Sequence, residues 1–162
     1  DELCVAREQG SLQRNFQGYS THADCDLIGL GVSSIGKVGD TYSQSVKELS
    51  HYYEHIDAGL LPVQRGYQLN ADDRVRRDVI NALMCHGRVD FAVIEAQHGI
   101  NFHVYFSDAI KQLKSHFDDG LVRLTNDCLT LLPQGQLMMR SVAMAFDAYL
   151  TNEGSDRFSR TV

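Results

Sequence analysis

The chain has 162 residues, a net charge of −6 and a hydrophobic content of 43%. This length allows one full domain or two small ones, and the hydrophobic content excludes a disordered chain. The acidic balance argues against an extended nucleic-acid-binding face, because such faces need concentrated lysine and arginine. No apolar run approaches the roughly 20 residues of a bilayer-spanning helix, and no signal sequence opens the chain, so we expect a cytoplasmic protein without a membrane partner.

The first helix is expected over residues 2–9, where Gly10 ends it. Residues 12–19 then alternate their side chains as a strand does, although most of these side chains are polar. Such a strand suits a core poorly, so we expect one of its faces to meet a ligand or another part of a larger protein. Residues 20–24 are expected to form a polar loop.

A glycine-rich stretch follows over residues 26–40, with four glycines inside an apolar run. Glycine lets the backbone pass close to a ligand, so one interpretation is a shallow apolar site for a flat molecule. The stretch lacks the third glycine of a dinucleotide fingerprint and the Gly-Lys-Ser/Thr sequence of a triphosphate loop. The other interpretation is a glycine-kinked buried strand followed by a turn, and the residues alone leave both open.

An amphipathic helix is predicted over residues 42–58, with Gly59 at its end. Its apolar positions recur every three or four residues and are Val46, Leu49, Tyr53 and Ile56. A short extended run then leads to residues 67–69. We place a domain boundary there, between 1–69 and 70–162.

The second half of the chain has the texture of a compact helical domain. Asp72 and Asp73 begin a helix with one apolar stripe of Val75, Val79, Ile80, Leu83 and Met84. Helices over 91–97 and 102–117 follow, and the latter is expected to turn Tyr105, Phe106, Ile110 and Leu113 inward. Residues 121–124 and 128–131 predict a β-hairpin. A last helix starts at Pro133 and packs residues including Leu137, Val142 and Phe146, before a polar tail over 153–160.

This order predicts an α+β fold that is mainly α, and it is the order of a winged-helix domain. DNA binding is therefore a competing hypothesis, but the charges oppose it. The third helix offers Lys111 and Lys114 against three aspartates. The cluster of Arg74, Arg76 and Arg77 stands beside Asp72, Asp73 and Asp78, which predicts an ion-paired surface instead of a phosphate contact.

Four cysteines, at Cys4, Cys25, Cys85 and Cys128, lie far apart and form no metal-finger or redox spacing. We predict reduced thiols, with Cys85 and Cys128 buried as small hydrophobic residues.

One histidine pair, His51 and His55, has the helical i, i+4 spacing. With Glu54 and Asp57 it would chelate a divalent ion, but we favour a solvated helix face.

Four segments, in this order and spacing, resemble the C-terminal third of the oxygen-independent coproporphyrinogen III oxidases, which are radical S-adenosylmethionine (SAM) enzymes. The segments are residues 15–19 (NFQGY), 28–35 (IGLGVSSI), 76–80 (RRDVI) and 158–160 (FSR). The resemblance implies that 1–69 form the end of an incomplete α/β barrel, the catalytic domain, and that 70–162 form a helical C-terminal domain covering the active site.

The same resemblance implies oxidative decarboxylation of two propionates of coproporphyrinogen III, which gives protoporphyrinogen IX. Its implied cofactors are SAM and a [4Fe–4S] cluster, and its partners are the N-terminal catalytic part of the same chain and an electron donor. We expect a monomer without a nucleic-acid partner. This sequence contains no Cys-x-x-x-Cys-x-x-Cys. We therefore expect a fragment that binds no cluster and is inactive alone.

In this family a second SAM lies near the first, and the positions matching Phe16, Gln17 and Ile35 line it. The resemblance implies a hydrogen bond from Gln17 and apolar contacts from Phe16 and Ile35; the alternative is that all three pack at a domain joint. A tetracarboxylate substrate also needs cations. We assign Arg14, Lys37 and Arg65 to it by charge alone.

Two alternatives remain open at this stage. The first is a related radical SAM protein that binds or carries haem. The second is a free-standing winged-helix interaction module.

Overall fold

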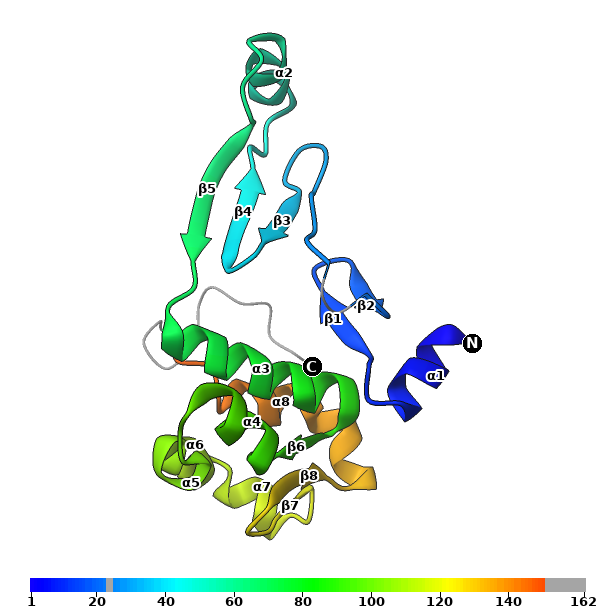
Figure 1. Cartoon of the computed structure of the whole chain (residues 1–162), viewed down its shortest axis with the longest axis vertical. Coiled ribbons are helices and arrows are strands. Elements are labelled where there is room, and N and C mark those ends of the chain that lie inside the picture. Colours follow the sequence, from blue (N-terminus) through cyan, green and yellow to red (C-terminus); the bar gives the residue numbers. More distant parts are fainter. Residues whose placement is uncertain (23–24, 151–162) are drawn as a thin grey trace.

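The computed structural model describes residues 1–22 and 25–150. Figure 1 shows a helical unit and, beside it, two small sheets formed by the N-terminal residues. The protein is therefore a mixed α/β structure with small sheets. The predicted polar tail at 153–160, the FSR segment and part of the predicted loop at 20–24 lie outside the described residues.

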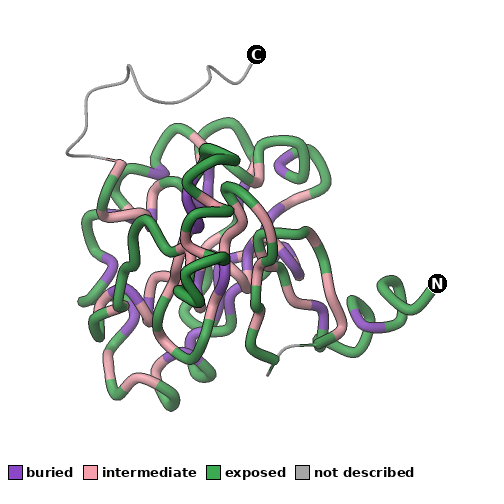
Figure 2. The backbone as a smooth tube through the Cα atoms, turned by 90° about the horizontal axis from the view of Figure 1, so that it is seen from above, coloured by how far each residue is buried: buried purple, intermediate pink, exposed green. Residues whose placement is uncertain are grey.

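The first helix, α1 (Glu2–Glu8), confirms the prediction for residues 2–9. The Asp1 side chain caps it by accepting a hydrogen bond from the Leu3 backbone N–H at 2.9 Å, and Gly10 has a φ of +73°. This helix projects from one side of the molecule (Figure 2), and Ala6 is its buried residue. Ala6 packs with Leu12 and Cys85 in a small satellite cluster.

The single strand predicted over residues 12–19 is wrong, because this segment folds into a tight hairpin. β1 (Gln13–Asn15) pairs with β2 (Gly18–Ser20) in antiparallel register. Asn15 accepts a hydrogen bond from the Gln17 backbone N–H at 2.8 Å, and Gly18 has a φ of +131°. An asparagine that bonds its own turn and a glycine with positive φ are the chemistry of a turn. Because side chains alternate throughout residues 12–19, the sequence pattern predicted one continuous strand and not a turn.

A three-stranded antiparallel sheet comes next, in the order β3 (Ile35–Val38), β4 (Thr41–Ser45) and β5 (Val63–Gln68). The helix predicted over 42–58 is therefore wrong in its first part, and α2 (Leu49–Asp57) begins later. Gly39, with a φ of +54°, reverses the chain tightly after β3, and Thr41 and Tyr42 are good strand formers. Hairpin pairing therefore outweighs the helical spacing of Val46.

The sheet and α2 together project from the helical unit, and we call residues 35–68 the arm (Figure 1). No residue of α2 is buried, and all six residues of β5 are exposed. The apolar side chains predicted for α2 lie on its surface, since Leu49, Tyr53 and Ile56 are 60%, 56% and 44% exposed. The arm thus has little core of its own.

The helical unit begins with α3 (Ala71–His86), which is the best-predicted element of the chain. Asn70 and Asp73 form a reciprocal capping box, and Gly87 ends the helix with a φ of +66°. Of the predicted stripe, Val75, Val79 and Leu83 are buried, and the other two members are partly buried against the same core.

Four short helices follow: α4 (Phe91–His98), α5 (Phe102–Tyr105), α6 (Ser107–Gln112) and α7 (Lys114–Asp118). The single helix predicted over 102–117 is interrupted at Phe106 and Leu113. Both of these residues are buried, as predicted. Tyr105 faces outward instead of inward, because its hydroxyl donates a hydrogen bond to the Asp72 carboxylate.

The predicted hairpin is confirmed as β7 (Val122–Leu124) and β8 (Cys128–Leu131). A third strand, β6 (Arg88–Asp90), pairs with β8 and gives the order β6-β8-β7. The sequence did not reveal β6, because three residues directly after a helix-ending glycine are too few to show alternation.

The chain then forms a 3₁₀ helix, η1 (Pro133–Met138), and α8 (Met139–Met144). Val142 and Phe146 are buried as predicted, but Leu137 is 94% exposed. Gly135 explains the irregular start, since a Cβ there would lie 2.0 Å from the Leu121 carbonyl oxygen. Only glycine permits this close approach, and the resulting turn directs Leu137 outward.

One continuous hydrophobic core holds the helical unit together. Its sixteen buried members all lie between Val75 and Phe146, and they include Phe102, Phe106 and Leu129. Cys85 and Cys128 are buried free thiols, as predicted. None of the helices in the described residues is both long enough and apolar enough to cross a membrane.

Candidate cofactor and substrate site

The glycine-rich stretch forms an open loop against the edge of β3, so its interpretation as a buried strand is wrong. Leu27 and Lys37 exchange backbone hydrogen bonds of 2.7 Å, while Ile28 and Leu30 are 74% and 87% exposed. A Cβ on Gly29 would lie 2.8 Å from the Ile35 carbonyl oxygen. Glycine therefore lets the loop close onto the first residue of β3.

Two of the three predicted SAM-lining residues meet at an open cavity of about 370 Å³, which we call the aromatic cavity. Its lining includes Phe16, Ile35, Tyr42, Gln44, Arg65 and Tyr67. The Phe16 ring meets the Tyr42 ring edge to face, with centroids 5.3 Å apart. Arg65 Nε donates to Gln44 Oε1 at 2.8 Å. The cavity thus offers an apolar wall beside a guanidinium and an amide.

Gln17, the third predicted residue, does not line the aromatic cavity. It occupies the turn between β1 and β2, where its side chain is exposed and its backbone N–H bonds to Asn15. Its neighbour Phe16 reaches the cavity because successive residues of a tight turn point in different directions.

The other two predicted cations lie at an adjoining cavity of about 280 Å³, which we call the cationic cavity. Arg14, Lys37 and Arg77 line it, together with Asn81 and the rings of Phe16 and Tyr42. Phe16 and Tyr42 line both cavities. The structure therefore groups Arg65 with Phe16 and Ile35, and groups Arg14 with Lys37.

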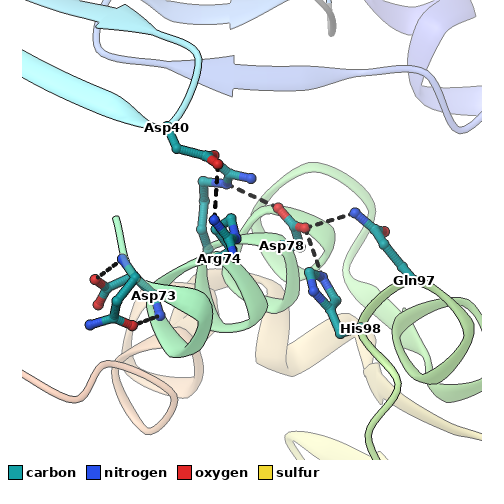
Figure 3. A network of polar contacts seen from close by, with 8 residues as sticks. Asp40, Asp73, Arg74, Asp78, Gln97 and His98 are labelled. Carbon is teal, nitrogen blue, oxygen red and sulfur yellow. Dashed lines mark hydrogen bonds and ion pairs between the residues drawn. The ribbon is translucent and has the colours of Figure 1, made fainter. Parts of the chain in front are cut away.

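Arg77, which lines this second cavity, also belongs to a polar network that joins the arm to the helical unit (Figure 3). Asp40, in the turn between β3 and β4, accepts hydrogen bonds from Arg74 at 3.1 Å and Arg77 at 3.3 Å. Partial burial raises the pKa of the Asp40 carboxyl, but the hydrogen bonds and charges of the two arginines outweigh it and leave the pKa below its usual value. Asp40 is therefore held as a carboxylate.

The network continues from α3 into α4 through Asp78. Arg77 Nε donates to Asp78 at 3.0 Å, and Asp78 is also bonded by the Gln97 amide at 3.0 Å and by His98 Nε2 at 2.9 Å. The hairpin turn, α3 and α4 are thus joined by consecutive charged contacts.

A second contact fastens the far end of β5. The hydroxyls of Tyr67 and Tyr149 donate to opposite oxygens of Asp73 at 3.0 Å and 2.7 Å. Burial alone would raise the pKa of the Asp73 carboxyl. The hydrogen bonds from the Asn70 backbone and from the two tyrosine hydroxyls outweigh burial, so the pKa is below the ordinary value of an aspartate. The neighbouring Tyr67 hydroxyl and the Asp73 carboxylate raise the pKa of Tyr149.

The predicted ion pairing of the arginine cluster is confirmed, since Arg76 pairs with Asp72 at 2.7 Å and Arg77 with Asp78. The roles of Asp40, Tyr42 and Tyr67 are not visible in the sequence. Tyr42 had been placed in a helix, and nothing local to Asp40 signals partners that lie more than thirty residues away.

Metal-binding side chains do not gather in the part of the chain that the structure describes. There, no three His, Cys, Asp or Glu side chains are placed to hold one ion. His51 pairs with Glu48 at 3.4 Å, and His55 Nδ1 bonds to the His51 carbonyl oxygen on the exposed α2 surface. These residues do not fit a [4Fe–4S] cluster, which needs three nearby thiolates. The aromatic cavity, in contrast, fits the apolar and polar parts of SAM.

Comparisons with known proteins all point to the same family of enzymes. Residues 69–138 match the family described as the HemN C-terminal domain. The chain is 46% identical over 162 residues to an oxygen-independent coproporphyrinogen III oxidase of Pseudomonas aeruginosa, and 43% identical over 163 residues to one of Escherichia coli. All of this chain is covered in both matches, but only 35% and 36% of these relatives.

A solved structure is also similar. It is described as coproporphyrinogen III oxidase (HemN) from Escherichia coli, a radical SAM enzyme, and matches with a TM-score of 0.89 at 44% identity. The match covers 92% of this chain and 34% of that one. The chain thus spans about a third of the length of the relatives it matches. Over its whole length the chain is similar to the C-terminal part of the oxygen-independent coproporphyrinogen III oxidases, and its residues 69–138 match the HemN C-terminal domain.

Proposed function

We propose that this chain is part of an oxidoreductase that converts coproporphyrinogen III to protoporphyrinogen IX by oxidative decarboxylation of two propionates. The observation that carries the proposal is the match of the entire chain, at 46% identity, to a relative named for this activity. The radical SAM description of the similar solved structure supports it. We further propose that this enzyme receives electrons from a separate donor, is a monomer and is located in the cytoplasm.

Within that enzyme, we propose that residues 1–69 complete an incomplete α/β barrel and that residues 70–162 form a winged-helix-like domain covering its active site. Helices α3 to α7, the β7–β8 hairpin and the closing helix α8 in 71–144 support the second part. The exposed apolar side chains of α2 support the first, because Leu49, Tyr53 and Ile56 are left uncovered by the described residues, and a neighbouring part of a barrel would cover them.

We also propose that the aromatic cavity contributes to a SAM site. Phe16 and Ile35 give the apolar wall, and the Arg65 guanidinium, oriented by Gln44, stands at its polar side. Gln17, exposed in the adjacent turn, reaches a ligand from outside the cavity. SAM, bound with an iron–sulfur cluster, supplies the radical chemistry of the reaction. This chain's residues position the molecule and exclude water.

The test is anaerobic turnover by the complete protein that contains this sequence, with SAM, a reductant and coproporphyrinogen III. We expect protoporphyrinogen IX, detected as protoporphyrin after oxidation, and release of two carbon dioxide molecules for each product. Tight haem binding without turnover would instead support a haem-carrying relative and would refute the proposal. Binding to duplex DNA that weakens steeply with salt would favour the winged-helix module.

A further inference from the structure

We propose that the cationic cavity binds a carboxylate group in the active site, with Lys37 and Arg14 as its ligands. This assignment rests on the proposed function, and it adds a binding role for residues that sequence analysis had selected only by their charge. The cavity lies where the β1–β2 hairpin, the arm and α3 meet, and it is lined from all three.

The charge of the lining is the first argument. Arg14, Lys37 and Arg77 line the cavity, and no described aspartate or glutamate does. An adjoining polar cavity of about 620 Å³ also contains Lys37 and Arg77, but there Asp26, Asp40 and Asp78 are added. Lys37 and Arg77 thus line both cavities, but the three aspartates line only the larger one, so the smaller one is suited to an anion.

The second argument is the availability of the cations. Arg77 is already engaged by Asp40 and Asp78, at 3.3 Å and 3.0 Å. Arg14 and Lys37, in contrast, form no ion pair within 4.0 Å with any carboxylate of the described residues. Lys37 is also half-buried, and its ammonium group has no carboxylate partner among the described residues. A ligand carboxylate would supply that partner.

The third argument is that main-chain hydrogen bonds hold the backbone of both residues in place beside the cavity. The main chain of Lys37 is bonded on both sides, since it pairs with Tyr42 in the sheet and exchanges two bonds of 2.7 Å with Leu27. Arg14 pairs with Tyr19 in the β1–β2 hairpin. Asn81 adds an amide from α3, where the Asp40 contacts fix the distance to the arm. Such preorganisation lowers the cost of binding.

Size restricts the ligand to an acidic arm. At about 280 Å³, the cavity suits a propionate or an amino-acid carboxylate, while a macrocycle would remain outside it, against the shared rings of Phe16 and Tyr42. A propionate of the tetrapyrrole and the methionine carboxylate of SAM have the same chemistry here. The experiment therefore measures both ligands separately.

The experiment uses the complete protein with three variants: Lys37→Gln, Arg14→Gln and, as a matched control, Lys47→Gln, which changes an exposed lysine outside both cavities. Binding of coproporphyrin III is titrated by porphyrin fluorescence, and binding of SAM by calorimetry. Coproporphyrin tetramethyl ester, which lacks the carboxylates, is the ligand control. Lys37→Arg, which keeps the charge, tests for rescue.

We expect Lys37→Gln and Arg14→Gln to weaken one ligand by about tenfold or more, because each removes a charge-assisted hydrogen bond. Lys47→Gln and the ester should show no such loss, and Lys37→Arg should recover most of the affinity. A loss confined to coproporphyrin identifies a propionate, and a loss confined to SAM identifies its carboxylate. Unchanged affinity for both ligands in Lys37→Gln and Arg14→Gln overturns the assignment. Absence of turnover in the wild-type protein would instead overturn the proposed function.

Discussion

Phe16 shows how a single residue links the two cavities of the candidate site. Its side chain is 54% exposed, although it contacts the Tyr42 ring and lines both cavities. A phenyl ring left open to solvent on the tip of a tight turn contributes little to folding. Its position therefore suits ligand contact better than it suits core packing.

We predict that Phe16→Ala weakens SAM binding by the complete protein about tenfold, because burial of a phenyl ring against a ligand contributes about 1.5–3 kcal/mol. Calorimetric titration with SAM checks this. Val38→Ala is the matched control, since Val38 lies at the end of β3, is 55% exposed and lines neither cavity. Equal affinities of wild type and Phe16→Ala would show that Phe16 is only a packing residue.

Asp73 leads to a second prediction, which concerns how the free energy of unfolding depends on pH. Its pKa is lower in the folded protein than the value of about 3.9 in an unfolded chain, because its bonds to Asn70, Tyr149 and Tyr67 outweigh its burial. The unfolded state therefore binds more protons as the solution is acidified. The stabilisation is complete above the unfolded pKa and is lost as the pH falls through the folded one.

We accordingly expect the free energy of unfolding to decrease from about pH 6 to about pH 3, with a shallower dependence in Asp73→Asn. Urea unfolding followed by circular dichroism at a series of pH values measures this slope. Asp90→Asn is the control, since Asp90 is exposed and pairs only with Arg88, at 3.5 Å. An identical slope in wild type and Asp73→Asn would contradict the role given to the two tyrosine hydroxyls.

Site residues were predictable only where a local signal or the family resemblance pointed to them. Phe16, Ile35 and Arg65 do converge on one cavity, and Arg14 and Lys37 on its neighbour. Asp40 and Tyr67 were not predictable, because their roles depend on partners in α3 and near residue 149. Carboxylates and tyrosine hydroxyls are common on protein surfaces. The hydrogen-bond partners of Asp40 and Tyr67 are determined by the tertiary structure.

Among the elements, those with a strong period and clear ends were predicted well. α3 has apolar residues at helical spacing, a capping box and a terminal glycine, and each signal indicates the same limits. The helix predicted over 42–58 failed because Tyr42 and Val46 satisfy the helical period by coincidence, while the strand is stabilised by pairing with β3 and β5. Such pairing is non-local and leaves no trace in a short window of sequence.

The close contact between Gly135 in η1 and Leu121, just before β7, gives a prediction at the scale of an element. A Cβ on Gly135 would lie 2.0 Å from the Leu121 carbonyl oxygen and 2.9 Å from its carbonyl carbon. Since these are backbone atoms, they yield only if η1 moves away from the sheet. We expect Gly135→Ala to lower the free energy of unfolding by ~2 kcal/mol or more.

The matched control is Gly66→Ala, where the nearest atom to a new Cβ is the Tyr42 carbonyl oxygen at an ordinary 3.5 Å. Thermal and urea unfolding of both variants measure the difference. A Gly135→Ala protein as stable as Gly66→Ala would mean that η1 adjusts without cost.

For the whole molecule, the unequal distribution of the core is the main feature. Every member of the large buried cluster lies in α3 or after it, whereas α2 and β5 contain no buried residue. The arm is joined to the helical unit at the polar Asp40 and Asp73 contacts, and the N-terminal residues Ala6 and Leu12 add a small apolar contact with Cys85 of α3. The stabilities of the arm and the helical unit are therefore expected to differ.

We predict that residues 70–162 fold on their own and unfold cooperatively, while residues 1–69 alone do not. Circular dichroism and urea unfolding of the two fragments test this. Phe102→Ala in the larger fragment is the control for a native core, and it should cost about 3–5 kcal/mol because Phe102 is fully buried. A gradual transition of fragment 70–162, or strong binding of a hydrophobic dye by it, would contradict the prediction.

The arm's sheet has one further consequence, which concerns the unpaired main-chain groups along its two edges. On β3, Leu27 already occupies the outer edge at Lys37, where it forms an isolated bridge. On β5, Val63–Gln68 pair with β4 on one side, and no described strand covers the other. Within the described residues, β5 is therefore the edge of this sheet at which another strand can add by main-chain hydrogen bonds. Without such a neighbour, this edge is the place where one copy of the chain would recruit another and begin to aggregate.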